Sequence, residues 1–191
     1  MPRLAQPSGT AASPEEYLRL EEAATERHEF VEGAIFMMAG GSTAHNRIAG
    51  LLYAKLLEAT DSDDCEVFIE NVKLRCPDET VYYPDVMLTC ESDDHHRYYR
   101  VHPCFIAEIL LDSTAVIDRG EKLLRYRAIP SLQSYALLAQ DTARAEVYKR
   151  LPDGSWRYDV LEGDAVLDIP CANLSLAVSS LYRGVLMDAS T

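Results

Sequence analysis

The sequence predicts an α/β domain in which a mixed β-sheet is flanked by helices. Three observations predict it. A helix with a broad apolar stripe is expected over residues 42–62, and the run CFIAEILLDST, residues 104–114, is almost continuously apolar, as in a central strand covered on both faces. A second amphipathic helix, VIDRGEKLLRYRAI, follows and is ended by Pro130. We expect one domain over residues 13–188, preceded by a flexible tail over residues 1–12.

The N-terminal part predicts a helix and a hairpin before the long helix. Ser13 is a good N-cap for the helix SPEEYLRLEEAA, Pro14 suits its first position, and Glu16 completes a capping box. The stretch RHEFVEGAIFMMAG reads as two short strands around a turn at Glu32 and Gly33.

The middle and C-terminal parts predict further strands. CEVFIENVKLRC (65–76) and TVYYPDVMLTC (80–90) each read as one strand, with a bend or start at Pro84, and ESDDHHRYYRVH (91–102) reads as a polar loop. Four more strands are expected in SLQSYALLAQ, RAEVYKR, SWRYDV and AVLDI, and a short helix in LSLAVSSLY (174–182) closes the chain.

The amino-acid composition and net charge limit the classes of function that we expect for this chain. The formal net charge of −13 weighs against a broad, non-specific DNA-binding surface, although a local site where metal ions offset carboxylates remains compatible with it. The sequence has neither an apolar run of about 20 residues nor a secretory signal, so we expect a cytoplasmic protein without a membrane partner. The five cysteines are scattered without a CxxC pair, and we expect free thiols.

Two carboxylates lie inside apolar strands. Asp85 follows Pro84 near a strand end, and Glu108 lies within FIAEILL. If the two strands are neighbours, the Cβ atoms of these acids lie about 5 Å apart on one face. Two ionised carboxylates at that distance repel, and a hard divalent cation such as Mg²⁺ or Mn²⁺ resolves the repulsion. The alternative is that each acid pairs with a nearby Arg or Lys, or that one is protonated.

A cation follows on the next predicted helix. Lys122 lies fourteen residues after Glu108 and shares a helical face with Arg119 and Tyr126. A helix returning over the sheet would bring Lys122 to the two carboxylates.

The order of these motifs resembles the PD-(D/E)xK nuclease superfamily, and more closely the Uma family of restriction-endonuclease-like proteins. The resemblance runs from about Ser13 to about Tyr148 and rests on RHEFVEG, AHNRI, YPDV, EILLDST and the D-x-x-x-K-x-x-x-Y pattern from Asp118 to Tyr126. It implies a restriction-endonuclease-like fold with additional C-terminal strands, and phosphodiester cleavage in DNA.

The resemblance also implies site residues. Asp85 matches the first acid of the PD motif, Glu108 the second acid, and Glu29 the early acid, with Glu32 a possible substitute. These acids would hold Mg²⁺ (or Mn²⁺), which activates water and stabilises phosphate charge. The superfamily lysine should stand two residues after Glu108, where this chain has Leu110; the resemblance implies that Lys122 supplies the cation instead.

The sequence leaves the roles of several other residues near the motifs open. His45 either approaches the site or caps its helix, and Tyr126 either orients a phosphate or water or packs in the core. His95, His96 and His102 lie in or beside an acidic loop, which is more typical of a solvated loop than of a transition-metal site.

Three hypotheses follow from the sequence. The first is a metal-dependent endonuclease acting on DNA, and a homodimer would let two sites meet a duplex symmetrically. The second is a catalytically inactive binding or assembly module that keeps the nuclease fold, which the net charge and Leu110 favour. The third is a structural acid pair in an unrelated α/β domain, in which Asp85 and Glu108 would lie apart.

Overall fold

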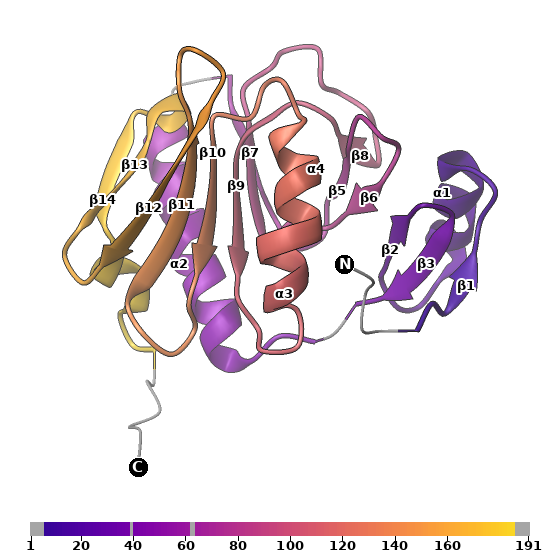
Figure 1. The fold of residues 1–191 in the computed structure, drawn as a ribbon, viewed down its shortest axis with the longest axis horizontal. Coiled ribbons are helices and arrows are strands. Elements are labelled where there is room, and N and C mark those ends of the chain that lie inside the picture. The colour runs from indigo at the N-terminus through magenta and orange to yellow at the C-terminus, as the bar shows by residue number, and fades with distance from the viewer. Residues whose placement is uncertain (1–5, 39, 62–63, 186–191) are drawn as a thin grey trace.

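A computed structural model describes residues 6–38, 40–61 and 64–185 (Figure 1). The first five residues of the expected tail, the last residue of the expected long helix and residues 186–188 of the expected domain lie outside the described residues.

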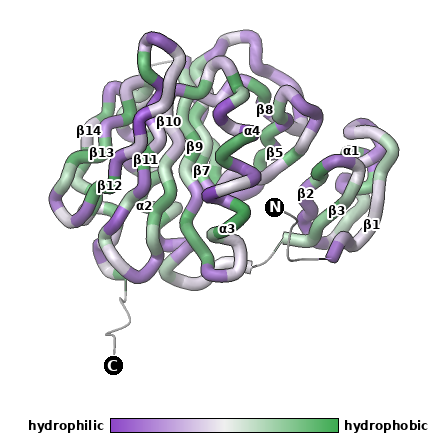
Figure 2. The backbone as a smooth tube through the Cα atoms, viewed as in Figure 1, coloured by the Kyte–Doolittle hydropathy of each residue, from purple (hydrophilic) through white to green (hydrophobic). Residues whose placement is uncertain are grey.

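The main sheet has six strands in the order β12-β11-β10-β9-β7-β4. Their bounds are β4 Glu66–Ile69, β7 Val86–Thr89, β9 Pro103–Ile109, β10 Ser134–Leu138, β11 Arg144–Arg150 and β12 Trp156–Glu162. The sheet is mixed, because β9 and β10 run parallel while the other neighbours are antiparallel. Every residue of β9 is buried, as expected for a central strand, and Figure 2 shows hydrophobic residues concentrated in β7 and β9.

Helices cover both faces of this sheet. The long helix α2 (Thr43–Thr60) packs on one face through Ile48, Leu52 and Leu56. On the other face lies one continuous helical segment made of α3 (Ala115–Ile117), the π-turn η1 (Asp118–Lys122) and α4 (Leu123–Arg127) (Figure 1). We call this the α3–α4 segment. The structure therefore confirms the predicted α/β architecture.

A second, smaller sheet has the order β1-β3-β2-β6-β5-β8. Its strands are β1 Gly9–Thr10, β2 His28–Val31, β3 Ala34–Met37, β5 Lys73–Arg75, β6 Val81–Tyr82 and β8 Tyr99–Arg100, and α1 (Pro14–Ala23) accompanies the β2–β3 hairpin. The predicted hairpin turn is confirmed: Glu32 and Gly33 both have positive φ, of 51° and 84°. Figure 1 shows α1 and β1–β3 standing at one side of the main sheet.

Two stretches that read as single strands are each broken in two. The stretch 65–76 divides at Glu70, which has a φ of 54°, so that β4 joins the main sheet and β5 the smaller one. The stretch 80–90 divides into β6 and β7 around Pro84, where the sequence predicted a bend or a strand start. Period-two patterning cannot show that a strand changes sheets, because both halves keep the same alternation.

The two ends of the chain also differ from expectation. Residues 8–11 are not a loose tail, because Gly9 and Thr10 pair with Ile35 and Ala34 of β3. Instead of a helix over 174–182, the chain forms β14 (Leu174–Ala177), paired with β13 (Val166–Ile169), and the 3₁₀ turn η3 (Val178–Tyr182); a further 3₁₀ turn, η2 (Pro170–Ala172), precedes β14.

The expectation of free thiols is wrong for four of the five cysteines. Disulfides join Cys65 to Cys90 and Cys104 to Cys171, and Cys76 is a buried free thiol. The antiparallel register of β4 and β7 pairs Glu66 with Thr89, which places Cys65 and Cys90 opposite each other at the next position. The spacing of the cysteines in the sequence does not reveal this pairing, because it depends on which strands lie next to each other in the sheet. None of the described helices is long and apolar enough to cross a bilayer.

The disulfides predict a redox-dependent stability. The Cys104–Cys171 bridge spans 67 residues of sequence, and in the loop-entropy account a loop of this length contributes about 4 kcal/mol to the free energy of unfolding. We expect Cys171→Ser to lower the urea midpoint of unfolding by the amount that corresponds to this lost stabilisation. Cys76→Ser removes a cysteine that belongs to neither bridge, so a reductant should destabilise this variant as much as the wild type. Alkylation and mass spectrometry of the denatured, unreduced chain should find one reactive thiol. Five reactive thiols would contradict the pairing.

Candidate active site

The two predicted acids meet on neighbouring strands of the main sheet. Asp85 directly precedes β7, and the β7–β9 register pairs Val86 with Ala107, so Asp85 faces Glu108 across the strand pair. The Asp85 backbone N–H points at Glu108 Oε2 at 3.4 Å, and Asp85 Oδ2 accepts a hydrogen bond from the Ile109 N–H at 2.7 Å. The hypothesis of an unrelated domain with these acids far apart is therefore excluded.

Lys122 reaches this pair from the α3–α4 segment. Its Nζ lies 3.0 Å from Glu108 Oε1, 3.1 Å from Asp118 Oδ1 and 3.5 Å from Glu29 Oε1. The Lys122 side chain is only 9% exposed, so these ion pairs are shielded from solvent. We call Glu29, Glu108, Asp118 and Lys122 the lysine–carboxylate cluster. The position expected from the superfamily pattern is filled by Leu110, which is buried in the core.

Glu29 comes from β2 of the smaller sheet. It is 8% exposed, and its contact with Lys122 links the β2–β3 hairpin to the α3–α4 segment. Glu32, the possible substitute, instead lies at the hairpin turn with a side chain 78% exposed and pairs with Arg125. The structure thus brings Glu29, and not Glu32, to the cluster.

Two tyrosines hold the cluster in place. Tyr126, one helical turn after Lys122, donates a hydrogen bond to Glu108 Oε1 at 2.9 Å. Tyr135 of β10 donates to the Asp118 carbonyl at 3.1 Å, inside the π-turn. The rings of Tyr126 and Tyr135 pack edge to face with centroids 5.1 Å apart. Tyr126 therefore packs in the core, one of its two expected roles, and its hydroxyl orients the Glu108 carboxylate. That it orients a phosphate or a water stays a prediction.

His45 approaches the site from the start of α2. Its Nε2 lies 3.3 Å from Asp85 Oδ1, and its buried Nδ1 has no hydrogen-bond partner among the described residues. The helix cap is Ser42, whose hydroxyl accepts a hydrogen bond from the His45 N–H. Burial lowers the pKa of His45, but the hydrogen bond and charge of Asp85 outweigh it and leave the pKa raised.

The site holds an excess of buried negative charge. Glu29, Glu108 and Asp118 contact a single lysine, Lys122, while Asp85 lies opposite Glu108 and faces His45. Burial, and after it the charges of Asp85 and Asp118, raise the pKa of Glu108 well above its usual value although Lys122 opposes the shift. Burial disfavours the charged form of Lys122, yet the carboxylates outweigh it and raise the pKa of this lysine. Such a site favours the uptake of further positive charge.

Asp118 belongs to the cluster although the sequence assigned it no role. Thr114 donates to its Oδ2 at 3.1 Å, and its Oδ1 faces Lys122. The signal was present in the spacing: Asp118 and Lys122 are four residues apart and share a helical face. His95, His96 and His102 are not among the described residues that line the site cavity, and the His96 ring stacks on Tyr99 at 3.7 Å between centroids.

The carboxylates of this site are of the chemical type that binds a hard divalent cation. In the described part of the chain, no three His, Cys, Asp or Glu side chains stand ready as a ligand group, and Lys122 lies among three of the carboxylates. Asp85 and the Glu108 Oε2 atom lie outside the contacts of Lys122, and carboxylate oxygens are the ligands that Mg²⁺ and Mn²⁺ prefer. Asp85 and Glu108 are therefore the residues that could hold such a cation.

The site opens into a cavity of about 220 Å³. Arg27, Phe36 and Met37 from the hairpin side and Thr114 and Ile117 from the helical side are among its lining residues.

Removal of the lysine should destabilise the fold. Lys122→Met leaves three buried carboxylates without their shared cation, which costs about 3–5 kcal/mol of unfolding free energy. The matched control is Lys55→Met on α2, whose side chain is 40% exposed and pairs with Glu58 across one turn; a loss below about 1 kcal/mol is expected. Urea denaturation measures both, and equal losses would show that Lys122 contributes no more than a surface lysine.

The sequence and the fold have counterparts among known proteins. Residues 14–179 match the Uma2 family, described as "Putative restriction endonuclease". The uncharacterized protein slr1290 of Synechocystis is 34% identical over 175 residues, covering 91% of this chain and 92% of the relative, and sll1609 of the same organism is 37% identical over 153 residues, covering 78% and 86%. A crystal structure titled as a putative nuclease belonging to DUF820 from Anabaena variabilis superposes with a TM-score of 0.74 at 18% identity, covering 92% of this chain and all of the other, which shows a shared fold. With the match spanning nearly the whole described chain, this protein belongs to the Uma2 family of restriction-endonuclease-like proteins.

Proposed function

We propose that this protein is a metal-dependent endonuclease that hydrolyses phosphodiester bonds in DNA. The observation that carries the proposal is the convergence of Asp85, Glu108, Glu29 and Lys122 in one largely buried site that has more carboxylates than cations. A structural role alone would be served by neutral pairing, whereas an excess of buried carboxylates is costly until protons or an added cation neutralise it. Membership of the Uma2 family supports the same reading.

The proposal assigns a distinct task to each side chain. Asp85 and Glu108 would hold Mg²⁺ or Mn²⁺, with Glu29 beside them, and the bound metal would lower the pKa of a water and stabilise charge on the phosphate. Lys122 keeps its proton, because three carboxylates surround it, and offers a fixed ammonium to an anionic phosphate.

Two further side chains would position the acids. Tyr126 fixes the orientation of the Glu108 carboxylate through its hydrogen bond, and His45 contacts the Asp85 carboxylate from the start of α2.

A catalytically inactive binding or assembly module is the second candidate. Its supporting observations are the net charge of −13, which opposes nucleic-acid binding, and Leu110 at the usual lysine position. The structure weakens the second point, since Lys122 places its ammonium against the acid that precedes Leu110 by two residues. A homodimer and a cytoplasmic location remain predictions.

The proposal is tested with plasmid DNA and Mg²⁺ or Mn²⁺. We expect nicking or linearisation by the wild-type protein, and a loss of about 100-fold or more in Asp85→Asn, because a metal supplies several kcal/mol of transition-state stabilisation.

The matched control is Asp94→Asn. Asp94 is a buried acid, 3% exposed, whose carboxylate accepts hydrogen bonds from the backbone of Val101 and His102 instead of facing the site. Activity should survive in this control wherever it folds. A wild-type protein that is inert on duplex DNA, single-stranded DNA and RNA would favour the inactive module.

A further inference from the structure

Arginines and aromatic side chains gather on one face of strands β11 and β12, beside the α3–α4 segment. The strand register pairs Tyr148 with Tyr158 and Arg150 with Trp156, so these four side chains share that face. The guanidinium carbon of Arg127, in the last turn of α4, lies 5.6 Å from the centroid of the Trp156 ring, and that of Arg150 lies 4.5 Å from it. We call these five residues the arginine–aromatic face.

Positive charge is in excess on this face. Among the described residues, neither Arg127 nor Arg150 has a carboxylate within ion-pair distance. Arg150 uses its Nε and Nη2 atoms to donate hydrogen bonds to backbone carbonyls, those of Arg127, Ile129 and Leu132, which do not cancel its charge. Burial, and after it the charge of Arg127, lower the pKa of Arg150, whereas a neighbouring carboxylate would raise it.

Two further arginines extend the positive charge along the face. Arg119 from the π-turn and Arg144 from the start of β11 share the carboxylate of Glu146, at 2.8 and 2.9 Å. Arg144 also lies 3.5 Å from Glu162, whose side chain is 71% exposed. Over the described residues, the four arginines at and beside the face thus have two carboxylates as ion-pair partners, in a chain with a net charge of −13. A local excess of cations on an acidic protein indicates a site for an anion.

The face also presents an aromatic ring to solvent. Tyr158 is 49% exposed, and its ring lies 5.0 Å between centroids from that of Tyr148, which stacks in turn on the buried ring of Tyr135. A row of rings that begins in the core therefore ends in a ring that a ligand can reach. Arginines beside an open aromatic ring combine the two features that bind single-stranded nucleic acid, since cations contact phosphates and ring faces stack on bases.

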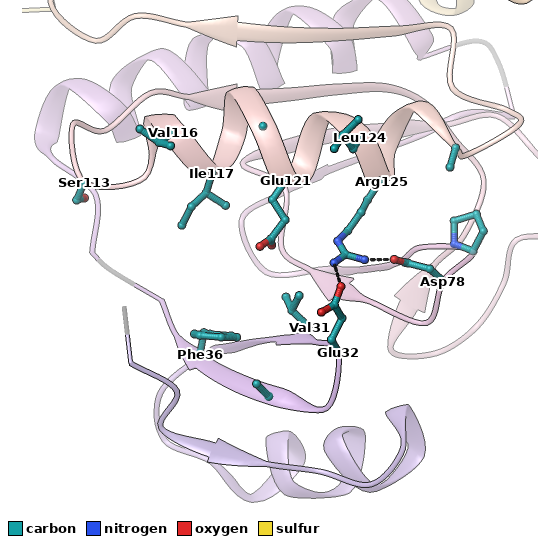
Figure 3. Close-up of a pocket in the computed structure, with 14 residues that line it drawn as sticks. Val31, Glu32, Phe36, Asp78, Ser113, Val116, Ile117, Glu121, Leu124 and Arg125 are labelled. Atoms are coloured by element: carbon teal, nitrogen blue, oxygen red, sulfur yellow. Dashed lines mark hydrogen bonds and ion pairs between the residues drawn. The ribbon is translucent and has the colours of Figure 1, made fainter. Parts of the chain in front are cut away.

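The hairpin side of the α3–α4 segment lacks these features. Arg125 is the one cation among the described residues that line the groove between this segment and the β2–β3 hairpin, and it is paired with Glu32 and Asp78 (Figure 3). The segment also stands between the arginine–aromatic face and the proposed active site, because Arg119 points to β11 while Lys122 points to the carboxylates of the site. The face is therefore a separate surface.

We propose that the arginine–aromatic face binds a single-stranded stretch of nucleic acid, with Arg127 and Arg150 contacting phosphates and Tyr158 stacking on a base. In a paired duplex the bases are closed to Tyr158, so only a strand that has left its partner makes both contacts. A two-fold dimer through this face is disfavoured, because it sets the arginines of one copy against those of the other. The inference rests on the proposed function for the class of its ligand, and it names a site that holds the strand away from the bond to be cut.

The test measures binding without metal, by fluorescence polarisation in EDTA of a labelled single strand of oligothymidine and of a DNA duplex. Tyr158→Ala should weaken binding of the strand about tenfold, the effect of roughly one stacked base, and leave binding of the duplex unchanged. Arg127→Glu should weaken binding of both and reduce the slope of log Kd against log salt concentration by about 1, because one phosphate contact is lost.

The matched control is Arg157→Glu. Arg157 lies between Trp156 and Tyr158 on β12, so its side chain points to the other side of the sheet, where it is 56% exposed. This variant changes the net charge as Arg127→Glu does, but away from the arginine–aromatic face. It should keep the affinity and the salt dependence of the wild type.

The outcomes separate this inference from the proposed function. The inference is overturned if the wild type does not bind the strand in EDTA, or if Arg127→Glu and Arg157→Glu weaken binding equally. It also fails if Arg127→Glu dissociates a dimer in analytical ultracentrifugation while strand binding is unchanged, since the face then joins two copies. Strand binding that depends on Arg127 and Tyr158 in a protein that cuts no substrate overturns the nuclease proposal alone.

Discussion

The ion-pair cluster around Lys122 is the interaction on which the rest of the site depends. One ammonium contacts carboxylates from three elements: Glu29 on β2, Glu108 on β9 and Asp118 in the π-turn. Each of these acids would be costly alone in the core, because an unpaired buried charge has lost its hydration. The lysine makes their burial possible and also fixes the smaller sheet and the α3–α4 segment against the main sheet.

The surrounding fold holds the residues of this site close together. The antiparallel pairing of β7 and β9 sets Asp85 opposite Glu108, and the π-turn within the α3–α4 segment carries both Asp118 and Lys122. π-Turns inside helices are frequent at functional sites, where they change the direction of side chains without ending the helix. From fully buried positions, Tyr126 then orients the Glu108 carboxylate, and Tyr135 donates a hydrogen bond to the Asp118 backbone carbonyl and so holds the π-turn.

Much of the architecture could be predicted from patterning, and the misses share a physical cause. The covered strand β9 and the helices α1 and α2 follow directly from apolar periodicity and capping residues such as Ser13. The change of sheet at Glu70, the pairing of residues 8–11 and the disulfide between Cys65 and Cys90 depend on contacts between distant segments, which no local pattern carries. Asp85 and Glu108 stand out because each is a charged residue inside an apolar strand, and Lys122 follows from its place on the next helix and from the family resemblance. Asp118 shares a helical face with Lys122, but the sequence does not show that this face lies against the carboxylates.

We propose that the carboxylates of Asp85 and Glu108 form a site for a divalent cation. Calorimetric titration of Mn²⁺ into the wild-type protein and into Asp85→Asn tests it most directly. We expect saturable binding of Mn²⁺ to the wild type and loss of that binding in Asp85→Asn, while Asp94→Asn should bind Mn²⁺ as the wild type does. Absence of Mn²⁺ binding to the wild type, or equal binding by Asp85→Asn, would contradict it.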